Sequence, residues 1–141
     1  MLLYSIGYQG KSLEGLCAKL ADNAVEILID VRERAWSNRP EFRKGALAEG
    51  LKRTGIEYLH LRSAGNPFRP RKGVSVQREL CLEYYSNYLA NSPDVVNSVA
   101  TLSRNNRSAL FCYEANADEC HRGVLIAALL KLNPDLTVVY L

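Results

Sequence analysis

Short apolar runs alternate along this chain with segments whose apolar residues recur at helical spacing. The runs are typical of strands, and we expect strands at residues 2–6, 27–31, 56–61, 108–113 and 136–141. The segments between them predict helices over residues 12–23, 44–54, 75–90, from 92 to about 102, and 124–132. Strand and helix signals therefore alternate along most of the chain.

The order of these elements predicts the fold class. Residues 27–31 are apolar at consecutive positions, as in a strand that is covered on both faces. A strand, a helix and a second strand in succession predict a right-handed parallel unit. We therefore expect a single α/β domain over residues 1–141, with three layers and a mainly parallel sheet of about five strands flanked by helices.

Single residues mark the ends and faces of the expected helices. Ser12 suits an N-cap, Gly55 suits a C-cap, and Ser92 suits an N-cap followed by a proline at the first helical position. The polar segments 32–43 and 62–73 are rich in arginine and contain proline, and we expect the second to be a long loop. In the helix at 75–90 the following residues suit one buried face: Val76, Leu80, Cys81, Tyr84 and Tyr88.

The composition is that of an ordinary globular protein, with 48% hydrophobic and 23% charged residues. No apolar run approaches the roughly 20 residues that span a bilayer, and the first residues lack the basic region of a signal peptide. We therefore expect a cytoplasmic protein with no membrane partner. The four cysteines are widely and unevenly spaced, which predicts reduced thiols. The net charge of +3 is too small to establish nucleic-acid binding.

Reactive side chains follow each of the first four expected strands. Because the carboxyl ends of parallel strands meet on one rim of a sheet, we expect these side chains to lie close together. A scaffold alone does not require such a distribution, so the rim is the predicted site. The residues are Ser5, Gly7 and Tyr8 after the first strand, Asp30, Arg32 and Arg34 after the second, His60, Arg62 and Asn66 after the third, and Cys112, Tyr113 and Glu114 after the fourth.

The densest cluster spans residues 112–122, at the turn between the fourth strand and the last helix. Cys112 or Cys120 is a candidate thiolate nucleophile, because a helix N-terminus lowers the pKa of a thiol. His121 is a candidate base, and Glu114 is a candidate general acid or base. Arg122 is expected to hold a negative substrate, and further substrate-binding candidates are Ser5, Tyr8, Asp30, Arg32 and Asn66.

Structural interpretations compete with these roles. Free cysteines often behave as small buried hydrophobes, and Asp30 with Arg32 suits a buried ion pair as well as a ligand site. His60 is better interpreted as a packed strand residue. We predict neither a cofactor nor a metal, because the adjacent Cys120 and His121 need an unusual turn to share one ion.

Basic residues gather in the two loop segments beside an aromatic residue in each, Trp36 and Phe68. Arginine and aromatic side chains together suit phosphate contact and base stacking, and the alternative is a solvated loop surface. The basic residues are Arg34, Arg39, Arg43, Arg62, Arg69, Arg71 and Lys72.

The sequence also resembles the DUF488 family, a family of unknown function, over nearly the whole chain. The most specific part is Cys112-Tyr113-Glu114 with Cys120-His121-Arg122. Further parts are the segment 4–14, Leu28-Ile29-Asp30-Val31-Arg32, Phe42 with Leu47, and Tyr58-Leu59-His60-Leu61 with Gly65-Asn66-Pro67. Many members have His-Ser after the first glycine, where this chain has Tyr8-Gln9, so it resembles a subgroup. The resemblance implies the fold and the site but supplies no reaction.

Three classes of function follow from these observations. The first is an enzyme, a hydrolase or a transferase, that acts on an anionic small molecule, a nucleotide or a nucleic acid. The second is a cysteine-dependent sulfur transferase, because residues 28–32 and a strand that ends in a cysteine weakly resemble the rhodanese superfamily. The third is a non-catalytic module that binds nucleic acid or a partner through the basic loops. The sequence predicts neither the oligomeric state nor the strand order.

Overall fold

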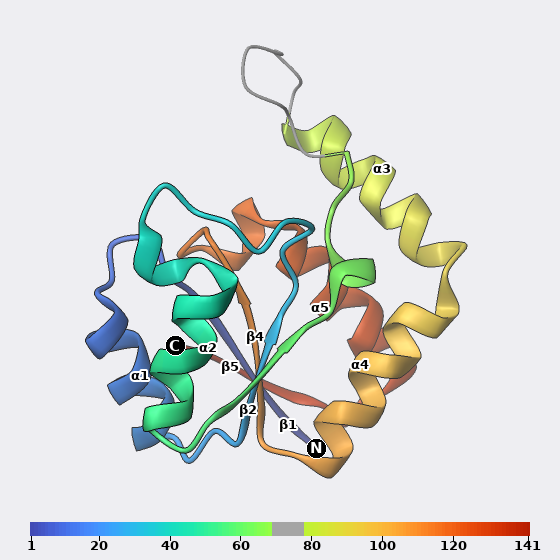
Figure 1. Ribbon diagram of the computed structural model, residues 1–141. Coiled ribbons are helices and arrows are strands. Elements are labelled where there is room, and N and C mark those ends of the chain that lie inside the picture. The colour runs from blue at the N-terminus through green and yellow to red at the C-terminus, as the bar shows by residue number, and fades with distance from the viewer. Residues whose placement is uncertain (69–77) are drawn as a thin grey trace.

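The computed structural model describes residues 1–68 and 78–141 (Figure 1). The expected loop at 62–73 and the expected start of the helix at residue 75 therefore lie partly outside the described residues. The same holds for four side chains that the sequence singles out, namely Arg69, Arg71, Lys72 and Val76.

Within the described residues, five strands form one sheet in which every pair is parallel. Their order across the sheet is β3-β2-β4-β1-β5. The predicted α/β fold with a mainly parallel sheet is confirmed. The strands are β1 (Leu2–Gly7), β2 (Ile27–Asp30), β3 (Glu57–His60), β4 (Ser108–Cys112) and β5 (Thr137–Tyr140).

Helices cover both faces of the sheet and make the three layers (Figure 1). One apolar core lies between the sheet and the pair α1 (Leu13–Asp22) and α2 (Lys44–Arg53). The other lies between the sheet and α3 (Arg78–Ala90), α4 (Pro93–Asn105) and α5 (His121–Leu132). Three short 3-10 turns complete the described elements, at Pro40–Phe42, Arg62–Ala64 and Ala117–Glu119.

The strand order creates a switch point between β1 and β4. From β1 the chain runs through α1 to β2 and on to β3 at one edge. It then returns to β4 and continues through α5 to β5 at the other edge. Because α1 and α5 leave neighbouring strands and cover opposite faces, the carboxyl ends of β1 and β4 form the topological switch point, the position at which open α/β sheets commonly bind ligands.

The two predicted serine caps behave differently. Ser12 caps α1, with its Oγ accepting a hydrogen bond from the backbone N–H of Gly15 at 3.0 Å. Ser92 occupies the N-cap position of α4, as predicted, but its side chain makes no capping hydrogen bond. Pro93 still begins the helix, because its fixed φ is already helical. Gly55 follows α2 with φ of 77°, as a C-terminal glycine should.

The buried face of α3 differs from the predicted one. Cys81, Tyr85 and Leu89 are buried, whereas Leu80 and Tyr84 are exposed. The hydroxyl of Tyr85 donates a hydrogen bond to the carbonyl of Ala64 at 2.6 Å inside the protein. A buried tyrosine needs such a partner, and the sequence does not reveal which of two adjacent tyrosines will have one.

Candidate functional site

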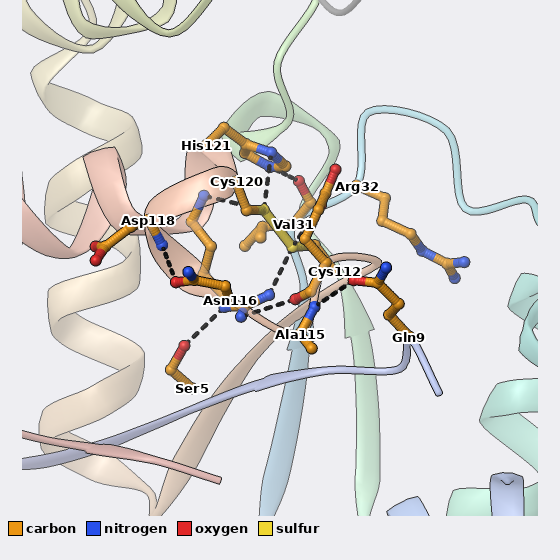
Figure 2. The surroundings of a disulfide bond; sticks show 12 residues. Ser5, Gln9, Val31, Arg32, Cys112, Ala115, Asn116, Asp118, Cys120 and His121 are labelled. Carbon is orange, nitrogen blue, oxygen red and sulfur yellow. Dashed lines mark hydrogen bonds between the residues drawn. A yellow bond between two sulfur atoms is a disulfide. The ribbon is translucent and has the colours of Figure 1, made fainter. Parts of the chain in front are cut away.

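Two cysteines from different elements meet at the carboxyl edge of the sheet. Cys112 is the last residue of β4, and Cys120 is the residue just before α5. The structure joins their sulfur atoms in a disulfide (Figure 2). The expectation of four reduced thiols is therefore wrong for this pair, because the fold closes the turn between them. Cys17 and Cys81 are free thiols buried elsewhere.

Cys120 is the N-cap of α5, which begins at His121, at the helix N-terminus expected for this cluster and before the apolar pattern starts at residue 124. Its Sγ accepts a hydrogen bond from the backbone N–H of Arg122 at 3.4 Å. The positive end of a helix favours a thiolate at this position. The first turn of α5 buries the polar His121 and Arg122 inside the site, so the apolar pattern alone placed the start of the helix too late.

The imidazole of His121 is oriented by the end of β2. Its Nε2 lies 2.7 Å from the carbonyl oxygen of Val31, so Nε2 carries the proton and donates it (Figure 2). In the neutral ring, Nδ1 then offers its lone pair, and Nδ1 lies 3.6 Å from Sγ of Cys120. The ring also stands edge-on against Tyr85, with the ring centroids 5.1 Å apart. His121 is thus positioned toward the sulfur of Cys120.

The guanidinium of Arg122 connects the site to β1. Its Nε donates to Ser5 Oγ at 2.7 Å, Nη1 to Cys112 Sγ at 2.7 Å, and Nη2 to the carbonyl of Glu114 at 3.0 Å. The side chain is 1% exposed, and this burial lowers the pKa of Arg122 to about 10, against the opposing charge of Glu114. Arg122 therefore stays cationic near neutral pH and faces the sulfur of Cys112.

The segment after Cys112 is held by Gln9, which is not among the predicted site residues, and by the close approach of Gly7, which is on the predicted rim. Gln9 accepts a hydrogen bond from the backbone N–H of Ala115 at 3.0 Å through Oε1 (Figure 2). Its own backbone N–H donates to the carbonyl of Tyr113 at 2.8 Å. A Cβ added to Gly7 would overlap the carbonyl of Glu114. A glycine at a strand end could have signalled this close approach, but a glutamine in a turn carries no such signal.

Glu114 lies at the border of the sulfur pair. Its Oε2 is 3.6 Å from Cys112 Sγ, and its side chain is partly buried. The sequence-based grouping of Cys112, Glu114, Cys120 and His121 is therefore also a spatial grouping. Their catalytic roles stay predictions.

Asp30 and Arg32 form a buried ion pair instead of facing the sulfur atoms. Nε and Nη2 of Arg32 both donate to the carboxylate, with Nη2 2.7 Å from Oδ2, and Nη1 donates to the carbonyl of Phe42 at 2.8 Å. Tyr58 adds a hydrogen bond from its hydroxyl to Oδ2 at 2.6 Å, and burial together with this carboxylate raises the pKa of Tyr58. Figure 2 shows the Arg32 guanidinium pointing away from the cysteines.

The electrostatics of Arg32 fit this structural pairing. Burial opposes its charge, but the hydrogen bonds and the charge of Asp30 keep the pKa of Arg32 above its ordinary value. The guanidinium also lies 5.6 Å from the ring centroid of Tyr8 and 5.1 Å from that of Phe111. A substrate-binding role for Asp30 and Arg32 stays a prediction.

Three other residues that the sequence singles out have partners inside the protein. Tyr8 is buried and stacks on Phe42 and Phe111, with centroid distances of 4.4 and 5.3 Å. Oδ1 of Asn66 is 2.9 Å from the backbone N–H of Phe68, and accepts its hydrogen bond. Nε2 of His60, the last residue of β3, is 2.7 Å from the carbonyl oxygen of Arg32, and its interpretation as a packed strand residue stays a prediction.

The described part of the basic loops presents aromatic residues to solvent. Trp36 is half exposed, and the guanidinium of Arg43 lies 4.9 Å from its ring centroid. Phe68 contacts Tyr84, with the ring centroids 5.6 Å apart. Nucleic-acid binding by these loops stays a prediction.

Comparison with known proteins agrees with the resemblance seen in the sequence. The family model described as Domain of unknown function DUF488 matches residues 12–129, which is more than half of the chain. The chain belongs to this family. Assignment to a DUF488 subgroup by Tyr8-Gln9 stays a prediction. No curated protein and no solved structure matches the chain. Among the described residues of this DUF488 protein, no helix has the length and apolar character needed to cross a membrane.

Proposed function

We propose that this protein is a thiol-dependent oxidoreductase in which Cys112 and Cys120 alternate between a dithiol and a disulfide. The proposal rests on one observation, the contact of two cysteine sulfur atoms at the switch point of the sheet. The two cysteines are 1% and 2% exposed. Such burial suits a small oxidant, and we propose a hydroperoxide.

Two features of the site support reactivity at Cys120. The backbone N–H of Arg122 favours the thiolate form of Cys120. Nδ1 of His121, 3.6 Å from the sulfur, is oriented to accept the thiol proton. Cys112 is supported as the second thiol, because the Arg122 guanidinium stabilises a negative sulfur at 2.7 Å.

The reaction balances in two steps. The Cys120 thiolate attacks one oxygen of the hydroperoxide, the O–O bond breaks, and the leaving oxygen takes the proton held by His121. This leaves a sulfenic acid on Cys120 and releases water or an alcohol. The Cys112 thiolate then attacks the sulfur of Cys120, the S–O bond breaks, and the hydroxyl group leaves as water with one further proton. Two molecules of a small thiol return the disulfide to the dithiol and become a disulfide themselves.

The arrangement of the arginines supports binding of an anionic substrate less strongly than the arrangement of the cysteines supports a reaction at sulfur. The guanidinium nitrogens of Arg32 and Arg122 already donate to protein acceptors. A guanidinium that is engaged in this way must exchange protein contacts before it can bind a phosphate or carboxylate. An anionic ligand therefore stays a separate prediction.

The proposal is tested by hydrogen peroxide consumption with a small thiol as reductant and a chelator present. Residues 108–122 form one tryptic peptide that contains both cysteines of the pair and no other cysteine. In the wild type we expect this peptide to lose two hydrogen atoms when peroxide is added. Turnover should be lost in Cys120→Ser and in Cys112→Ser, whereas Cys112→Ser should still form one sulfenic acid.

The matched control is Cys81→Ser, which removes a buried free thiol in α3. It should turn over peroxide at the wild-type rate. Equal turnover in Cys120→Ser, or a wild-type rate no faster than that of a free cysteine, contradicts the proposal.

A further inference from the structure

Three possible metal-donor atoms of the site lie close together. The two sulfur atoms of Cys112 and Cys120 and a ring nitrogen of His121 all lie within 4.8 Å of one another, and all three residues are buried. Two thiolates and an imidazole are the donor set that tetrahedral zinc prefers in proteins. We infer that the reduced protein binds one Zn²⁺ ion through Cys112, Cys120 and His121.

The spacing of one donor pair, Cys120 and His121, supports this inference. Zinc bonds of about 2.3 Å to sulfur and about 2.0–2.1 Å to nitrogen, at the tetrahedral angle, put the two ligand atoms about 3.6 Å apart. Sγ of Cys120 and Nδ1 of His121 are 3.6 Å apart. The adjacent residues Cys120 and His121 can therefore share one ion, because the N-cap residue and the first helical residue direct their side chains to the same side.

Each of the three ligands also has a protein partner that orients it. The Nε2–H of His121 donates to the carbonyl of Val31, which leaves Nδ1 as the lone-pair donor. Sγ of Cys120 accepts from the backbone N–H of Arg122, and Sγ of Cys112 accepts from its guanidinium. Metal ligands in proteins are commonly held by such outer hydrogen bonds, which fix the ligand geometry.

The charges of the site balance when the ion is present. Two thiolates offset the charge of Zn²⁺, and the carboxylate of Glu114 offsets that of Arg122, on which it acts electrostatically. Glu114 Oε2 lies 3.6 Å from Cys112 Sγ, next to the three donors. A buried guanidinium next to two buried thiolates therefore does not oppose zinc.

This inference goes beyond the proposed function and does not depend on it, because two thiolates can hold an ion whether or not peroxide oxidises them. Oxidation removes both thiolates, since the disulfide has no charge with which to bind the ion. Zinc and the disulfide are therefore alternative states of the same two sulfur atoms.

The test is zinc binding by the reduced protein. The chain is reduced with a phosphine, freed of metal with a chelator, loaded with zinc chloride, desalted and analysed for zinc content. We expect one ion per chain in the wild type and in the Cys81→Ser control. Cys112→Ser, Cys120→Ser and His121→Asn should each bind at least about tenfold more weakly, because loss of even an orienting residue costs about 10–100-fold. With equal amounts of cobalt in place of zinc, thiolate-to-metal absorption should be strongest in the wild type and in Cys81→Ser and weaker in the three ligand variants.

The wild type alone supplies a second readout, which holds even where a variant fails to fold. Zinc should protect both thiols of the peptide 108–122 from alkylation in the reduced protein, and the oxidised protein should bind no zinc. No zinc in the reduced wild type, or equal zinc in the oxidised protein, overturns the inference.

Failure of the inference and failure of the proposed function give different results. Peroxide turnover without zinc binding leaves the oxidoreductase and removes the metal site. Zinc binding with peroxide turnover that does not need Cys120 leaves the metal site and removes the oxidoreductase.

Discussion

Arg122 is among the largest fully buried side chains that the structure describes. A buried guanidinium loses its hydrogen bonds to water, so acceptors within the protein must replace them. The acceptors are a serine hydroxyl on β1, a sulfur at the end of β4 and a carbonyl in the following turn. Arg122 on α5 thus connects β1 with the end of β4 and the turn that follows it, and the carbonyl it needs is that of Glu114.

Gly7 allows the Glu114 carbonyl to reach this position, which leads to a prediction about Gly7→Ala. The added methyl group would overlap that carbonyl, so the turn must move. We expect a loss of about 1–3 kcal/mol in the free energy of unfolding, as for other overpacked sites, measured by urea denaturation. Peroxide oxidation of the Cys112–Cys120 pair should also slow.

The control for this change is Gly45→Ala in α2, where nothing lies within 4 Å of the added atom. Alanine is favoured over glycine in a helix by up to about 1 kcal/mol, so stability should be unchanged or slightly greater. Equal free energies of unfolding for the Gly7 and Gly45 variants would show that the turn moves with no loss of stability.

At the scale of single elements, the helix starts show how far a local pattern can be trusted. A serine before a helix predicts a cap because its oxygen can satisfy a free N–H of the first turn. Ser12 does this for α1, whereas Ser92 before α4 does not, although both have the same sequence signal. Cys120 caps α5 with a sulfur atom, which a search for serine, threonine, aspartate or asparagine misses. Cap type therefore follows from local backbone geometry.

The two serines provide a matched pair of substitutions. Ser12→Ala should lower the free energy of unfolding by about 1 kcal/mol, because the N–H of Gly15 loses its acceptor. Ser92→Ala should change it by less than about 0.5 kcal/mol. Urea denaturation of both variants measures the difference, and a larger loss for Ser92→Ala than for Ser12→Ala contradicts the capping assignment.

At the scale of the whole molecule, two separate polar assemblies lie at the carboxyl edge of the sheet. The first assembly surrounds Cys112 and Cys120 and faces α5. The second is the Asp30–Arg32 pair, which packs among Tyr8, Phe42 and Phe111 near α2. The shared rim was predicted correctly from the strand ends. Its division into two assemblies was not, because that depends on which face of the sheet each side chain takes and on the strand order.

Asp30→Asn tests whether the second assembly is structural. The change leaves the Arg32 guanidinium buried without its carboxylate, so we expect a loss of about 3–5 kcal/mol in the free energy of unfolding. Zinc content and peroxide turnover of the fraction that stays folded should be close to those of the wild type. Urea denaturation and the two site assays measure both effects.

Glu33→Gln is the matched control, because Glu33 pairs with Arg62 at the surface, where the arginine side chain is 75% exposed. Surface pairs contribute about 0–1 kcal/mol, so its stability should be nearly that of the wild type. If Asp30→Asn is as mild as Glu33→Gln, the buried pair does not hold this part of the fold together.

The sequence by itself determined the elements, the parallel sheet and the grouping of Cys112, Glu114, Cys120 and His121. Each residue is apolar or polar by itself, and the spacing of apolar residues along a segment indicates which face of a helix or strand is buried. Only the tertiary structure decided the strand order, the contact of the two sulfur atoms and the partners of Arg32 and Arg122. These depend on where distant segments meet, and a hydrogen bond between residues 5 and 122 leaves no pattern in either segment.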